Sequence, residues 1–261
     1  MIESLKKLGT ARELLVTLTL RDIRVRYKQS ILGIAWAILQ PLSLMLVFTV
    51  FASLTGLSSG DKGIPYPIFV YCAVLPWTFF ATAVRFAVPS LVTNHNLVTK
   101  TYFPREVMPM ASIGACFVDF LVASVIFVGM MVFYRIPLRP TVLLVPVILT
   151  VQIVLTLAIA LVGSAMNVFY RDIRYAIPLA LQIWLFASPV MYSVDRVPQS
   201  FRWIYFTNPM AAIINAYREV ILRGRLPDAN LLLSSTAIAV GAAIVGYAIF
   251  KRMEMKFADV I

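Results

Sequence analysis

The sequence predicts an all-α integral membrane protein: six transmembrane helices, an N-terminal amphipathic interface helix, and re-entrant helices between spans five and six. Apolar residues make up 61% of the 261 residues, charged residues only 13%, and the mean hydropathy is +0.87. Soluble domains carry about 25% charged residues. The apolar residues also form long charge-free runs, and a helix needs ~20 apolar residues to cross the hydrocarbon core of a bilayer.

Residues 1–30 are predicted to form a cytoplasmic interface helix rather than a span. Polar residues recur every three or four positions from Lys6 to Lys28, and Leu15 and Leu18 fall on another side. Such a pattern places Lys and Arg near phosphate head groups. A solvated amphipathic helix packed on protein is the alternative. This stretch is charged and has no central apolar core, so no cleavable signal peptide is expected.

Residues 31–261 are predicted to form a single six-span domain. Its spans are expected at 31–57, 65–90, 108–134, 141–169, 175–194 and 230–250. The stretch 195–228 is too long for a tight turn and too apolar for a solvated loop. A seventh span there would place Arg218 and Glu219 in lipid, at a cost of several kcal/mol. One or two re-entrant helices on the outer side are therefore expected instead.

The distribution of basic residues predicts that both termini face the cytoplasm. Of the 23 Lys and Arg residues, Arg85 falls within a span, fourteen lie in the segments assigned to the inner side and eight in the outer segments. Cytoplasmic loops of membrane proteins carry an excess of Lys and Arg. The net charge of +11 therefore reflects membrane orientation, and no nucleic-acid partner is expected.

The sequence offers no catalytic residues and no metal site. It has one His, and its two cysteines, Cys72 and Cys116, lie inside apolar runs, where small buried side chains are the expected interpretation. A GxxxxGK[ST] phosphate-binding loop is absent from the sequence. If this protein transports a solute actively, the energy must come from another subunit or from an ion gradient.

Two charged residues, Arg85 and Asp119, fall within predicted spans. Arg85 is close enough to the inner end of its span to reach the interface. Asp119 lies deep in the third span, where a lone carboxylate would be neutralised or paired. A structural Arg85–Asp119 pair is the favoured interpretation, and a role in ion coupling is the alternative.

Aromatic residues lie well inside the second and fifth spans. Trp77, Phe80 and Trp184 are candidates for lining a substrate path, because aromatic faces stack on sugar rings without requiring one register. Some of the aromatic residues of the chain belong to the ordinary interfacial belt. Simple packing of the helix bundle is the competing explanation for these three.

Two short, charged turns join spans on the inner side, at 99–106 and 167–174. A stiff helical connection of this kind suits insertion into a groove of a partner protein. The alternative is that both turns are ordinary helix ends with membrane-anchoring Arg residues.

Four sets of residues resemble a known family. They are 21–27 (RDIRVRY), 30–41 with its SILGIAW and QP motifs, 167–173 (NVFYRDI), and 207–209 (TNP) followed by Arg218. In order and spacing they are similar to the permease subunits of ABC transporters that export polysaccharides, such as O-antigen (lipopolysaccharide) and teichoic-acid exporters. The resemblance covers essentially the whole chain.

The resemblance implies a homodimer in the bacterial cytoplasmic (inner) membrane, served by two copies of an ATP-binding cassette subunit. That partner would bind ATP and Mg²⁺, so no cofactor is expected in this chain. Lys100, Arg105 and Glu106 are expected to contact it. The substrate would be a glycan on an undecaprenyl-type lipid carrier.

The re-entrant segment is expected to form the outer gate, with a seal made by Phe206, Met210 and Ile214. Apolar side chains can close a pore by excluding water. A permease that exports a small molecule, a drug or a lipid, driven by an ATPase partner or by ions, is the alternative function.

Overall fold

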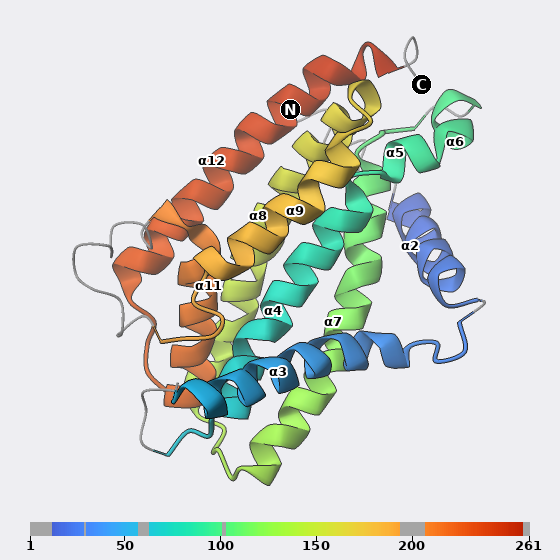
Figure 1. The fold of residues 1–261 in the computed structure, drawn as a ribbon. Coiled ribbons are helices and arrows are strands. Elements are labelled where there is room, and N and C mark those ends of the chain that lie inside the picture. Colours follow the sequence, from blue (N-terminus) through green and yellow to red (C-terminus); the bar gives the residue numbers. More distant parts are fainter. Residues whose placement is uncertain (1–11, 29, 57–62, 101–102, 194–206, 258–261) are drawn as a thin grey trace.

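The computed structural model describes residues 12–28, 30–56, 63–100, 103–193 and 207–257, and the regular elements in these ranges are helical (Figure 1). Five helical stretches there are long and apolar enough to cross a membrane. They are α3 (Ala35–Thr55), α4 (Tyr66–Ala87), α7 (Val107–Phe133), the 3₁₀ turn η1 (Pro140–Leu144) continued by α8 (Val145–Phe169), and α12 (Ala229–Glu254). The predicted spans one to four and six are thereby located to within a few residues.

The fifth predicted span, 175–194, corresponds to a shorter helix, α9 (Ile173–Ala187). The helix ends because Ser188 has an extended backbone and precedes Pro189, whose ring disfavours helical geometry in the residue before it. Fifteen residues of α-helix rise only ~22 Å. That is less than the ~30 Å hydrocarbon thickness, so α9 by itself does not have spanning length.

The bundle has two ends. At one, called here the α6 end, α4 is followed by the short helices α5 (Ser90–Thr93) and α6 (His95–Lys100), and α12 finishes nearby (Figure 1). At the other, the η1 end, α7 is connected to α8. The described part of 195–228 contains α11 (Pro209–Tyr217), which continues directly into a π-helical turn, η4 (Arg218–Arg223). Phe206 lies outside the described residues.

Helix α4 forms the centre of the bundle, in contact with α3, α7, α8, α9 and α11. Helices α8 and α12 pack closely along each other where Gly246 faces the carbonyl of Ala158. A Cβ at Gly246 would lie only 2.9 Å from that oxygen, so the absent side chain permits the approach. Small residues commonly allow this closeness between membrane helices.

The predicted N-terminal helix is present over its described part as α2 (Arg12–Tyr27). It lies against α7, where Leu18 is buried with residues of α7, α8 and α12. Thr19 occupies the space beside Gly114 of α7, with its hydroxyl oxygen 3.1 Å from the position a Cβ would take. One face of α2 is therefore fixed on protein.

Candidate functional site

The three aromatic residues proposed from the sequence lie together at the contact between α4 and α9. The ring centroids of Phe80 and Trp184 are 5.2 Å apart and those of Trp77 and Trp184 are 6.4 Å apart, both in edge-to-face geometry. Phe80 is fully buried and Trp77 nearly so, whereas Trp184 is half-buried. Phe80 and Trp77 therefore serve mainly in packing, whereas Trp184 keeps part of its surface accessible.

A groove of about 510 Å³ runs between α3, α4 and α9. Trp77 lines it, and Arg85 lies along the same groove as an exposed residue. Its lining alternates apolar side chains with hydrogen-bonding ones, the latter being Gln40, Ser43, Thr78 and Gln182. Such a surface can hold a ligand that carries both C–H faces and hydroxyl groups.

The TNP motif fixes the start of α11 to the end of α9. Asn208 caps α11: its Oδ1 accepts from the backbone N–H of Met210 at 3.1 Å. The same oxygen accepts from the Trp184 indole Nε1–H at 2.9 Å, and Asn208 Nδ2 donates to the Ala187 carbonyl at 3.1 Å. Trp184 thus has a positioning role that sequence reasoning did not assign to it.

Two of the three residues proposed for the outer seal, Met210 and Ile214, are fully buried. They belong to the main apolar core, because α11 packs against α4, α8 and α12. Their role as a seal remains a prediction. The structure places them as packing residues that hold α11 inside the bundle.

Arg218 is buried in the protein, with 2% of its surface exposed. Its guanidinium lies over the Phe69 ring at 3.7 Å and donates to the carbonyls of Pro189 and Val190 at 2.5 and 2.7 Å. It also donates to the Phe69 carbonyl of α4 at 3.3 Å. Burying a charge is costly unless hydrogen bonds compensate it. Here the hydrogen bonds of Arg218 compensate that cost. They also connect three segments of the protein: η4, α4 and the turn that follows α9.

A buried hydrogen-bond chain connects three helices near Pro76, a proline inside α4. Gln152 of α8 donates from Nε2 to the Pro76 carbonyl at 2.7 Å. Its Oε1 accepts from the Tyr217 hydroxyl of α11 at 3.0 Å. Because Gln152 is fully buried, this chain links α11 to the middle of α4 without solvent.

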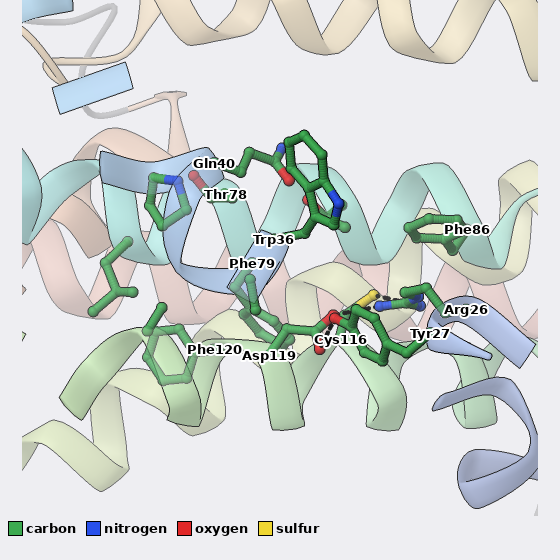
Figure 2. A pocket seen from close by; sticks show the side chains of 15 residues that line it. Arg26, Tyr27, Trp36, Gln40, Thr78, Phe79, Phe86, Cys116, Asp119 and Phe120 are labelled. Atoms are coloured by element: carbon green, nitrogen blue, oxygen red, sulfur yellow. Dashed lines mark hydrogen bonds and ion pairs between the residues drawn. The ribbon is translucent and has the colours of Figure 1, made fainter. Parts of the chain in front are cut away.

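Asp119 is paired, as expected for a carboxylate within a span, but not with the residue that the sequence suggested. It lies midway along α7, forms an ion pair with Arg26, and accepts from the Tyr27 hydroxyl at 2.7 Å (Figure 2). Arg85, the expected partner, lies instead along the groove beside α9. Asp119 of α7 faces α2, and the sequence alone could not establish this orientation. Burial, together with the Asp119 carboxylate, raises the pKa of the Tyr27 phenol.

The residues proposed to contact a partner differ in accessibility at the α6 end. Lys100 is exposed and Arg105 half-buried, with Arg105 Nη1 donating to the Glu254 carbonyl at 3.1 Å. Glu106, 2% exposed, accepts from Lys251 Nζ at 3.0 Å. Its side chain therefore ties α7 to α12 within this chain, which leaves Lys100 and Arg105 as the more accessible candidates. Within the described residues, no group of three or more His, Cys, Asp or Glu could hold a metal ion.

Comparison with known proteins identifies the family. The profile of the ABC-2 type transporter membrane domain matches residues 13–222. This chain belongs to that family. It is 30% identical over 257 residues to the O-antigen export system permease protein RfbA of Klebsiella pneumoniae, covering 97% of both chains. It is 29% identical to the Myxococcus xanthus protein of the same name over the full length of both.

A more distant relative is the polysialic acid transport protein KpsM of Escherichia coli, 22% identical over 253 residues. That match covers 91% of this chain and 92% of KpsM. The relatives are thus similar to this ABC-2 chain over nearly their whole length, and the family expected from the sequence motifs is confirmed.

Besides the Trp184–Asn208 and Glu106–Lys251 contacts, sequence reasoning missed the Arg26–Asp119 pair, the Gln152–Tyr217 link and the carbonyl cage around Arg218.

The last three differ in what the sequence offered for them, taken in that order. One signal for the first was available. Leu18, Asp22 and Arg26 are spaced four residues apart and so share one helix face. The other two depend on side chains meeting across distant helices, for which the sequence carried no local signal.

Proposed function

We propose that this ABC-2 chain is the membrane-spanning subunit of an ATP-driven exporter that moves a lipid-linked polysaccharide, such as O antigen, across the cytoplasmic membrane. The observation that carries this proposal is the end-to-end similarity to permeases named for O-antigen export and, more distantly, for polysialic acid transport. The groove with Trp77 and its hydrogen-bonding neighbours supports it, since glycans present both kinds of surface.

In the proposed topology the α6 end and both termini face the cytoplasm. Helix α9 makes the fifth of six crossings with help from the turn that follows it, and α11 with η4 is a re-entrant segment of the outer side. Arg218 supports this assignment, because its carbonyl cage and its burial remove the cost of a lipid-exposed charge. The segment 194–206, between α9 and α11 in the sequence, lies outside the described residues.

The proposed assembly is a homodimer with two ATP-binding cassette subunits below it. ATP and Mg²⁺ would be bound by those subunits, and hydrolysis would take place there. Lys100 and Arg105 are the proposed contact residues on this chain, because both lie at the α6 end and neither is buried. The proposed substrate is a glycan on an undecaprenyl-type carrier.

The pathway is proposed to include the α3–α4–α9 groove, to whose wall Trp77, with 4% of its surface exposed, contributes a small stacking surface. To test this, Trp77→Ala is compared with Trp77→Tyr, which retains an aromatic face. Loss of a stacking contact of about 1 kcal/mol would slow polymer export about fivefold. Export of lipid-linked polymer is measured beside efflux of a small dye, at equal amounts of folded protein.

Export near the wild-type rate in Trp77→Tyr and slowed export in Trp77→Ala are the expected results. Unchanged polymer export in Trp77→Ala, combined with impaired dye efflux, would instead identify the chain as a small-molecule permease.

A further inference from the structure

Arg85 is the one charged residue among the described residues that line the groove between α3, α4 and α9. It lies in the last turn of α4, which ends at Ala87, and it is exposed. Within the described part of the chain its guanidinium forms no hydrogen bond or ion pair. Its positive charge and all of its N–H donors are therefore available to a ligand at the α6 end of the groove.

Arginine residues elsewhere in the bundle have their charge compensated within the chain. Arg26 is paired with Asp119, and Arg218 donates to backbone carbonyls. Arg85 has no such compensation among the described residues, although it belongs to a helix long and apolar enough to cross a membrane. An ionisable side chain of that kind in a membrane protein indicates a functional site.

Other side chains of the same groove also have unused hydrogen-bonding groups. Gln40, Thr78 and Gln182 line the groove, and none of these side chains has a hydrogen-bond partner in the described structure. Thr156, by contrast, donates to the carbonyl four residues before it, as threonine in a helix can. The described lining includes no Asp or Glu. A cation with neutral donors and no carboxylate favours a ligand that has several anionic oxygens.

We propose that Arg85 binds the phosphate group that joins the exported glycan to its lipid carrier. The planar guanidinium can donate two parallel hydrogen bonds to a phosphate. Trp77, on the wall of the same groove, lies eight positions before Arg85 in α4, a rise of ~12 Å. The first sugars of the glycan would then lie between these two residues. The inference rests on the proposed function, since it takes the substrate to be a lipid-linked polysaccharide.

The position of Arg85 in the membrane also suits a lipid head group. In the proposed topology the α6 end faces the cytoplasm, and basic pockets between helices on that side bind phosphate-containing head groups. Val47 and Leu179 line the groove as well and are 57% and 61% exposed. The polyprenyl chain would lie against these apolar side chains and remain among the lipids of the bilayer.

The test is native mass spectrometry of the purified full-length protein in detergent with equal amounts of undecaprenyl phosphate, undecaprenol and phosphatidylglycerol. These probes separate the phosphate from the polyprenyl chain and from ordinary anionic lipid. The wild type should bind undecaprenyl phosphate in preference to the other two. Arg85→Gln should bind it about tenfold more weakly, because a charge-assisted hydrogen bond is lost. Arg85→Lys, which keeps the charge without the planar fork, should be intermediate.

The matched control is Arg252→Gln, which removes the same charge at an exposed position near the α6 end of α12, outside the groove. It should bind undecaprenyl phosphate as the wild type does. A second variant, Gln182→Glu, keeps Arg85 and adds a carboxylate to the groove with little change in shape. It should also weaken binding of undecaprenyl phosphate and leave binding of undecaprenol unchanged.

Four outcomes would overturn the proposal. They are unchanged binding of undecaprenyl phosphate by Arg85→Gln, an equal loss in Arg252→Gln, and equal binding of phosphatidylglycerol and undecaprenyl phosphate by the wild type. The fourth is loss of a dimer on Arg85→Gln in the same spectra, which would assign Arg85 to a contact between two copies. Slowed polymer export in Trp77→Ala beside any of these outcomes would refute this inference and leave the proposed function standing.

Discussion

Helices α3 and α4 are nearly equal in length, both are apolar enough to cross a membrane, and each contains an internal proline, yet they occupy opposite environments. In the most apolar stretch of α4, 78% of the residues are buried inside the protein; in that of α3 the figure is 17%. Figure 1 shows α4 within the bundle and α3 crossing its outside obliquely. Apolar composition therefore brings a helix to the membrane without deciding whether it faces protein or lipid.

The two helices also differ in the contacts that hold the bundle together. Helix α4 contributes the aromatic cluster, the carbonyl for Gln152 and a carbonyl for Arg218, so it organises the fold. Helices α3 and α4 both line the groove described above, and the remaining apolar surface of α3 is available to lipid and to the second copy proposed above.

The largest expected effect comes from truncating the same residue type in each helix. Phe80→Ala in α4 removes a fully buried ring and should lower the free energy of unfolding by about 3–5 kcal/mol. Phe51→Ala in α3 removes a ring that is 47% exposed and should cost under about 1 kcal/mol. Unfolding in mixed micelles titrated with SDS measures both. Equal losses of stability in the two variants would contradict the difference in burial between α4 and α3.

A somewhat smaller effect is expected from Arg218→Met, which tests how α4 is connected to η4 and to the turn after α9. The variant leaves the carbonyls of Phe69, Pro189 and Val190 without their donor, and the free energy of unfolding should fall by about 3 kcal/mol. Arg218→Lys keeps the charge but can donate fewer hydrogen bonds. Its free energy of unfolding should therefore lie between those of Arg218→Met and the wild type. A wild-type unfolding curve for Arg218→Met would show that the cage does not support the fold.

The smallest effect is expected where α2 leads into α3. Asp119→Asn leaves Arg26 without its counter-charge, at a cost of about 2 kcal/mol. Adding Arg26→Gln removes that stranded cation, so the double variant should lose less than the sum of the two single variants. The same unfolding assay gives the coupling energy. Additive losses would mean that the pair does not fix the end of α2 to α7.

Much of the fold was predictable because the bilayer imposes a length and a composition on any crossing helix. Five of the six predicted spans lie where apolar runs of sufficient length placed them, and the N-terminal helix was recognised from its periodicity. The fifth span was predicted too long, since hydropathy continued past Ser188–Pro189 while the backbone could not remain helical there.

The candidate site was predictable only in part. Trp77, Phe80 and Trp184 do meet, but no sequence pattern predicted that Trp184 would bind Asn208 or that Glu106 would turn inward to Lys251. The Asp119 partner was misassigned, because spans adjacent in sequence suggested Arg85, whereas Arg26 is 93 residues away along the chain.

By itself, the sequence determined that this protein lies in a membrane, where its helices begin, and to which transporter family it belongs. Those properties depend on local composition and on motifs that each act within one segment. Only the tertiary structure decided which apolar helix is the core, which charges are paired and which aromatic side chains remain accessible. The physical reason is that an apolar side chain is equally acceptable against lipid and against protein, so long-range packing and buried polar contacts make the choice.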